Sequence, residues 1–177
     1  MGFPTQFTQL LSENWICVIG EGLEMTNTEF FKNYWRYYLM LEKKFLETIE
    51  YVEIHTDNYG SFSNEFTMLL QAIGAELDNV FKVYCGFNLK DRKNISDYAK
   101  IILSDYPDII RQIVKVKDRD IILIPFKNWN VERAAQSLQW WKAFDDIKHN
   151  RCENIKEGNL GNVLNILAAL YLVPCNI

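Results

Sequence analysis

The residues best suited to chemistry lie at the end of a predicted aromatic helix. His149, one of two histidines in the chain, follows Asp145 by four residues, which puts a carboxylate one helical turn from the imidazole. Such a neighbour favours the charged imidazole and orients the ring. Arg151 adds a planar guanidinium suited to phosphate. With Lys148 and Asn150 as binding residues, His149 and Arg151 could act on a phosphodiester, His149 as general acid or base.

The same residues also have a purely structural interpretation. The C-terminal end of a helix attracts lysine, histidine and arginine, because its last carbonyl groups lack partners and the helix dipole is negative there. Lys148, His149 and Arg151 could therefore do no more than cap the helix. Exposure separates the two interpretations, because a site requires His149 and Arg151 in an open groove, whereas structural residues would be buried against carboxylates.

Carboxylates of a second predicted helix are another candidate. Glu65 and Glu76 are eleven residues apart, close to three helical turns, so they could share a face, and Asp78 follows. Di-metal sites in helical bundles usually add a Glu-x-x-His motif, which is missing from this sequence. The acids could equally be solvated or pair with Arg151 or Lys148. We therefore expect neither a metal ion nor another cofactor.

The charge balance argues against a protein held on nucleic acid by global attraction. The 177 residues include 19 Lys and Arg against 23 Asp and Glu, which gives a net charge of −4. A local basic patch is compatible with this, and its best candidate members are Lys142, Lys148, His149 and Arg151. Aromatic residues make up 14% of the chain. They indicate either a core packed with rings or, if exposed beside basic residues, a surface on which bases stack.

The cysteines and the apolar segments bear on location. No two of the four cysteines form a C-x-x-C pair, so free thiols are expected at Cys17, Cys85, Cys152 and Cys175. Cys152 is a further candidate nucleophile, since the adjacent Arg151 would lower the pKa of its thiol. The chain starts without a signal-peptide pattern, and its longest apolar run, residues 163–173, is too short to span a bilayer. We expect a cytoplasmic protein without a membrane partner.

Hydrophobic periodicity predicts a mainly α protein. Apolar residues recur at steps of three and four residues, which is typical of amphipathic helices. This pattern predicts a single domain over residues 1–177, a helical bundle of about five to six helices with a small β-hairpin near residues 113–124. We expect the helices at residues 3–19, 26–53, 61–84, 97–104, 130–147 and 159–173.

Local signals predict where these helices begin and end. The expected starts are a capping box at Thr26 and Glu29, Ser61 or Ser63, Ser96, and Asn128 or Asn130. Gly86 and Pro174 are expected to end helices. Gly74, inside the second long helix, predicts the close approach of a neighbouring helix. The two long helices should be antiparallel, and the last helix, apolar nearly all round, should be central.

The order of the helices and two motifs resemble the HEPN-like helical superfamily, which includes toxin and phage-defence ribonucleases and many non-catalytic members. The motifs are W-W-K-A-F-D-D-I-K-H-N-R and, after it, N-L-G-N-V-L-N-I-L-A-A-L. They also resemble uncharacterised bacterial and prophage-type proteins. The resemblance implies a helical fold, a homodimer, a defence or prophage context, and RNA or a partner protein as ligand.

The catalytic pattern of that superfamily is altered in this chain. Its active nucleases have an arginine followed four to six residues later by a histidine, whereas here His149 precedes Arg151 and positions 155–157 are Ile, Lys and Glu. Two hypotheses follow. We favour a non-enzymatic binding or interaction module, and the alternative is a metal-independent ribonuclease or RNA-binding toxin that uses residues 148–151.

Overall fold

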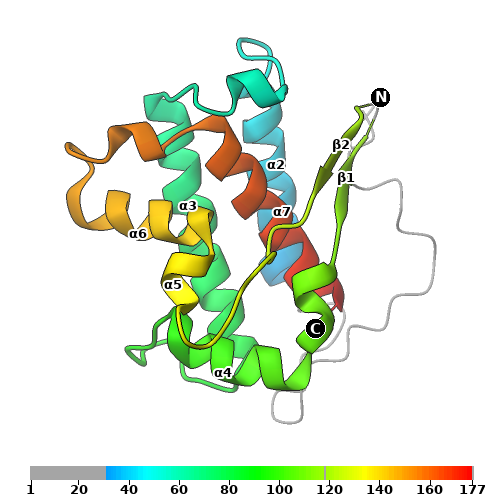
Figure 1. The fold of residues 1–177 in the computed structure, drawn as a ribbon, viewed down its shortest axis with the longest axis vertical. Coiled ribbons are helices and arrows are strands. Elements are labelled where there is room, and N and C mark those ends of the chain that lie inside the picture. Colours follow the sequence, from blue (N-terminus) through cyan, green and yellow to red (C-terminus); the bar gives the residue numbers. More distant parts are fainter. Residues whose placement is uncertain (1–30, 118, 177) are drawn as a thin grey trace.

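The computed structural model describes residues 31–117 and 119–176 and is mainly helical. Six α-helices, α2 to α7, and one two-stranded hairpin form the described part of the chain (Figure 1). The expected fold class, a helical bundle with a small hairpin, is confirmed. The helix expected at residues 3–19 and the capping box at Thr26 and Glu29 lie outside the described residues.

Helices α2 (Arg36–Thr48) and α3 (Asn64–Tyr84) form the expected antiparallel pair (Figure 1). A short π-helical segment, η2 (Phe31–Trp35), precedes α2. The prediction that this helix runs to residue 53 is wrong, because α2 ends at Thr48. The Thr48 hydroxyl donates to the Phe45 carbonyl oxygen, 2.6 Å away, and so competes with the helical hydrogen bonds there. Tyr51, beyond the end, is 87% exposed.

The boundaries of α3 agree with the sequence. Of the two serines considered, Ser63 is the cap, and its Oγ accepts a hydrogen bond of 3.0 Å from the backbone N–H of Phe66. At the other end, Gly86 has a φ of +69°, a left-handed conformation that stops the helix. The connection from α2 to α3 contains the short helix η3 (Thr56–Asn58).

Helix α4 (Ile95–Asp105) starts at a different residue from the one expected. Asn94, not Ser96, is the cap, and it forms a capping box with Asp97. The Asn94 side chain accepts from the backbone N–H of Asp97, and the Asp97 carboxylate accepts from the backbone N–H of Asn94. These reciprocal hydrogen bonds explain why α4 is capped by Asn94 and not by Ser96. A 3₁₀ turn, η4 (Pro107–Arg111), follows.

The hairpin is confirmed. Strands β1 (Val114–Val116) and β2 (Ile121–Leu123) pair antiparallel, with Val114 opposite Leu123. Val114, Val116 and Leu123 are buried, whereas Lys115 and Ile122 face outward. The buried face supplies the helix support that an isolated hairpin needs.

The aromatic helix expected over residues 130–147 is two helices, α5 (Ala134–Ser137) and α6 (Gln139–Asn150). The chain is extended at Leu138, with φ −112° and ψ 98°. The indole N–H of Trp140 donates to the Pro125 carbonyl oxygen at 2.6 Å, which ties the start of α6 to the segment after the hairpin. Asn130 accepts from the backbone N–H of Arg133. Val131, expected to face inward, is 42% exposed.

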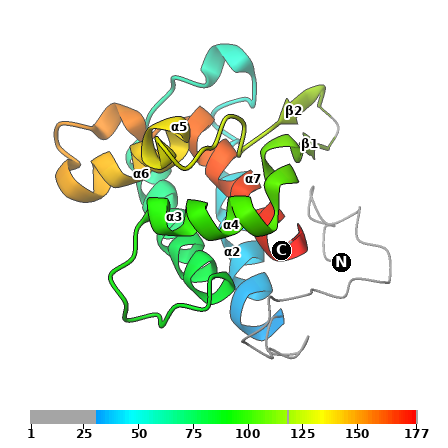
Figure 2. The ribbon, with the colours of Figure 1, turned by 60° about the horizontal axis from the view of Figure 1, so that its bottom comes forward.

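The last helix, α7 (Leu160–Asn176), is central as expected. It packs against α2, α3 and α6 (Figures 1 and 2), and its residues from Leu160 to Val173 are largely buried. It does not stop at Pro174, because one missing backbone N–H so near the end costs the helix little. A 3₁₀ turn, η5 (Ile155–Glu157), connects α6 to α7.

The aromatic residues belong mostly to the core. All the described tryptophans are buried, and rings from four segments contact one another. The group is Phe81, Tyr98, Phe126, Trp129, Trp140 and Trp141. Their burial supports a core of rings rather than a stacking surface. None of the described helices has the combined length and apolar character needed to cross a bilayer.

Candidate functional site

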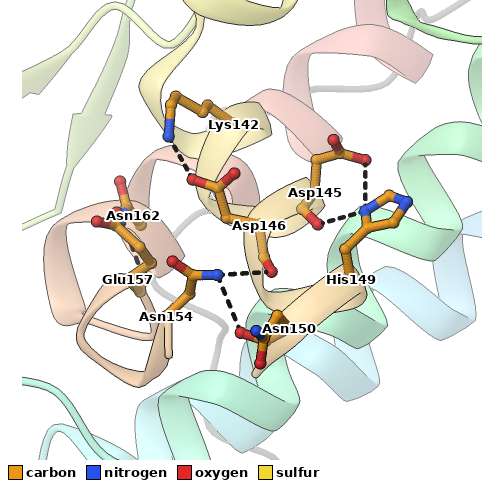
Figure 3. A network of polar contacts seen from close by, with 8 residues as sticks. All are labelled: Lys142, Asp145, Asp146, His149, Asn150, Asn154, Glu157 and Asn162. Atoms are coloured by element: carbon orange, nitrogen blue, oxygen red, sulfur yellow. Dashed lines mark hydrogen bonds and ion pairs between the residues drawn. The ribbon is translucent and has the colours of Figure 1, made fainter. Parts of the chain in front are cut away.

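His149 lies in the last turn of α6 and contacts Asp145, as the four-residue spacing predicts. Its Nδ1 is 2.8 Å from the carbonyl oxygen of Asp145 and 3.4 Å from Oδ1 of the same residue (Figure 3). A carbonyl oxygen only accepts, so Nδ1 carries the proton and donates. The His149 side chain is 71% exposed. The imidazole is therefore held on its own helix and is not part of the core.

Arg151 does not join His149. It continues the helical backbone, with φ −57° and ψ −39°. Residues two apart on a helix point to nearly opposite sides, so the imidazole of His149 and the guanidinium of Arg151 are not brought together within the chain. Arg151 and Asn150 are both exposed. The side chain of neither has a hydrogen bond or ion pair within residues 31–117 and 119–176.

The C-terminal end of α6 is capped by a residue that the sequence analysis did not consider. Nδ2 of Asn154 donates to the carbonyl oxygens of Asp146, at 3.1 Å, and Asn150, at 2.9 Å (Figure 3). The backbone N–H of Asn154 also donates to Asn150. Of the three basic residues at this end, only His149 contacts a carbonyl group. The capping interpretation therefore does not account for Lys148 and Arg151.

Lys148 lines a depression of about 300 Å³ between the end of α6 and the start of α4, which we call the α6–α4 depression. Its lining includes Asp78, Lys93, Ser96, Trp141, Asp145 and Lys148. The Lys148 ammonium lies 5.5 Å from the centre of the Phe144 ring, and the Lys93 ammonium lies 4.2 Å from that of Phe87. Two cations from distant segments thus reach one concave surface, each beside an aromatic ring.

Sequence reasoning missed Lys93. The segment between α3 and α4 contains three basic residues, Lys90, Arg92 and Lys93, to which the sequence analysis assigns no role. The sequence shows that these residues are basic, but it does not show that Lys93 lies near Lys148. The two lysines are 55 positions apart, and the packing of α6 beside the start of α4 brings them together.

The carboxylates near the α6–α4 depression already have partners. Asp78 accepts from the Tyr98 hydroxyl at 2.8 Å and pairs with the Lys82 ammonium at 2.8 Å. Asp145 lies beside His149. In the part of the chain that the structure describes, neither Lys93 nor Lys148 has a carboxylate partner. Lys93 and Lys148 are thus not held in ion pairs there, and although the Asp145 carboxylate is part of the same lining, the depression can accept a small anionic group.

A second ion pair holds Lys142, which was expected in the same basic patch. Its ammonium contacts the Asp146 carboxylate (Figure 3), and this hydrogen bond raises the pKa of Lys142. Because the partner compensates its charge, Lys142 contributes less to anion binding than Lys93 and Lys148 do.

The candidate acids of α3 are not brought together. Glu65 is exposed in the first turn, and Asp78 is paired as described above. Glu76 is half-buried, and burial raises the pKa of its carboxyl. Neither Arg151 nor Lys148 pairs with these acids. Among residues 31–117 and 119–176 no group of three or more His, Cys, Asp or Glu side chains could hold a metal ion.

The two described cysteines are free and differ in surroundings. Cys152, directly after Arg151, is exposed. Cys85, at the end of α3, is half-buried, and burial together with the nearby Asp105 carboxylate raises the pKa of its thiol to about 12. Cys152 is therefore the more accessible nucleophile of the two.

Comparisons with known proteins give no family for this chain: no family model, no curated protein and no solved structure matches it.

Proposed function

We propose that this chain is a non-enzymatic binding module that holds single-stranded RNA by its phosphate groups at the α6–α4 depression. The observation that carries the proposal is the convergence of Lys93 and Lys148, without carboxylate partners, on one concave surface. Arg151, exposed and without a partner in the described chain, is available to extend the contact. Ammonium and guanidinium groups are the usual partners of phosphate.

RNA is favoured over a folded acidic protein for two reasons. The resemblance to HEPN-like proteins, several of which act on RNA, rests on the segment that contains Lys148. The depression is also small, about 300 Å³, which fits a phosphate and its sugar better than a protein surface. Because the chain as a whole is acidic, with a net charge of −4, binding should depend on a few local contacts and so be moderate in strength.

The geometry gives less support to a nuclease. His149 and Arg151 leave α6 on nearly opposite sides, so the guanidinium does not lie beside Nε2, the nitrogen of His149 that its bond to Asp145 leaves free to act as a base. The ribonuclease remains the alternative outcome of the test below.

The test is fluorescence anisotropy of a labelled oligouridylate with wild type, Lys93→Glu, Lys148→Glu and the double variant. Lys43→Glu, at an exposed position of α2, is the matched control. We expect each reversal at the depression to weaken binding at least about tenfold and the control to bind as wild type. For the double variant, the slope of log affinity against log salt should fall by about 1.4, since a single strand contributes about 0.7 for each phosphate contact.

Two results would contradict the proposal. One is that wild type does not bind the oligonucleotide at low salt, or that all five proteins bind it with the same affinity. The other is cleavage of the oligonucleotide that His149→Ala abolishes at unchanged melting temperature, which would instead support the ribonuclease. Gel analysis of the same samples distinguishes binding from cleavage.

We further propose, from the resemblance to HEPN-like proteins, that the module is a homodimer in a bacterial defence or prophage system. Free thiols at Cys85 and Cys152 are compatible with a cytoplasmic location. Light scattering of the purified chain tests the oligomeric state: a monomer at the concentrations used for RNA binding would contradict the dimer and leave the RNA proposal intact.

A further inference from the structure

A second concave surface lies away from the α6–α4 depression and has different chemistry. It is a groove of about 380 Å³ that we call the amide groove. Four segments line it: Tyr59 after η3, residues 124–128 after the hairpin, residues 137–140 at the junction of α5 and α6, and the first turns of α7. The start of α7 lies beside α6 (Figure 1). Its volume is that of a small-molecule site.

Two asparagines of α7 present fixed acceptors to this groove. Asn162 is only 7% exposed, and its Nδ2 donates to the carbonyl oxygen of Glu157 at 2.9 Å and to Oε2 of the same residue at 3.3 Å (Figure 3). Asn165, one turn later, donates from Nδ2 to the Gly161 carbonyl oxygen at 2.9 Å. These bonds fix the orientation of both amides, because a carbonyl oxygen in place of the NH₂ group would face another oxygen.

The amide oxygens of these two residues have no hydrogen-bond donor in the described part of the chain. Oδ1 of Asn162 and Oδ1 of Asn165 accept no hydrogen bond within residues 31–117 and 119–176. Both residues line the groove, and positions three apart lie on the same face of a helix. Neither oxygen is fully buried, so a donor group in the groove can reach both. The α7 wall therefore offers two acceptors to a ligand that donates hydrogen bonds.

The opposite wall attracts negative charge. Leu138, the residue before α6, provides no side-chain cap, and residues 137–140 line the groove, so the positive end of the helix dipole lies at this wall. Lys127 adds an ammonium group to the same lining. No carboxylate residue lines the groove, so a metal cation is disfavoured.

We infer that the amide groove binds a small zwitterion of the α-amino acid or dipeptide class. Its ammonium group would donate to the two asparagine oxygens, and its carboxylate would accept from the start of α6 and from Lys127. An ammonium group has three donors and so satisfies both oxygens at once. Apolar contact would come from Ile124, Pro125 and Leu138, which also line the groove. The inference is independent of the RNA proposal, because the two surfaces share no lining residue.

The test is saturation-transfer NMR with a mixture of the twenty amino acids and glycylglycine, followed by calorimetry with each compound that binds. We expect one or more to bind, and Asn165→Leu and Lys127→Glu each to weaken binding at least about tenfold, the effect of losing a hydrogen bond to a charged group. Lys115→Glu, on the outward face of β1, should bind as wild type. Lys93→Glu and Lys148→Glu should also leave this binding unchanged.

Blocked ligands assign the two ends. The N-acetyl form of the best ligand, which lacks the ammonium group, should bind weakly to wild type, and Asn165→Leu should not weaken its binding further. The carboxamide, which lacks the carboxylate, should also bind weakly to wild type, and Lys127→Glu should not weaken its binding further. If no compound in the mixture binds, or if binding survives both groove variants at equal melting temperature, the inference is wrong. Binding of uridine monophosphate in competition with the zwitterion would also overturn it and assign the groove to nucleotides.

Discussion

The ring of Phe144 occupies the space that a side chain at Gly74 would need. A Cβ atom built on Gly74 would stand 2.5 Å from Cγ and 2.7 Å from Cε2 of that ring. Glycine at this position lets α6 pack closely against α3, and α6 in turn positions Lys148 and the rest of the candidate site.

Gly74→Ala should therefore destabilise the protein. Overpacking in a core costs about 1–3 kcal/mol, which outweighs a gain in helix propensity of up to about 1 kcal/mol. Urea denaturation measures the difference. Gly60→Ala is the matched control, because a Cβ there would meet nothing within 4 Å. Gly74→Ala should cost less stability in a Phe144→Leu background, where the ring is absent, than in wild type. An equal cost in the two backgrounds would contradict the assigned contact.

Asn154→Ala should loosen the end of α6. The substitution removes the donor that satisfies the carbonyl oxygens of Asp146 and Asn150, and we expect a loss of about 1–2 kcal/mol in the free energy of unfolding. Asn150→Ala is the comparison, since the exposed Asn150 side chain has no partner in the described chain and its backbone carbonyl is retained. A loss of equal size in both variants, measured in urea, would show that the Asn154 side chain is not the cap.

Local signals predicted much of the fold. Ser63 and Gly86 bound α3 through interactions with residues a few positions away, so the sequence contains the full signal. The capping box of α4 is also local, since Asn94 and Asp97 are three positions apart. Serine caps helices as well as asparagine does, so residue type alone does not distinguish Asn94 from Ser96.

Features that depend on distant residues were not predictable. The break at Leu138 accompanies the bond from Trp140 to Pro125, fifteen positions away, and residues 130–147 keep a helical pattern across it. Lys93 meets Lys148 only through packing. The acceptors at Asn162 and Asn165 also escaped notice, because periodicity marks α7 as a core helix and assigns no role to its amides.

Stability should fall as the pH rises through the titration of Glu76. Burial raises the pKa of this carboxyl above its ordinary value, so between the ordinary and the raised pKa the folded protein binds more protons than the unfolded chain. The free energy of unfolding then decreases with pH over that window. Glu76→Gln should be more stable than wild type at pH 7 and match it at pH 4. Glu132→Gln, at an exposed position, is the control, and an equal difference at both pH values would contradict the assignment.

Cys152 should react with thiol reagents far faster than Cys85. The pKa of Cys85, about 12 through burial and the Asp105 carboxylate, leaves a thiolate fraction of about one in ten thousand at pH 8, whereas Cys152 is exposed. With Cys17 and Cys175 replaced by serine, peptide mass spectrometry after N-ethylmaleimide treatment should find Cys152 labelled and Cys85 unlabelled. Asp105→Asn should speed labelling of Cys85, because it removes a charge that opposes the thiolate. In urea both thiols should react alike, and equal rates in the folded protein would mean that Cys85 is not sheltered.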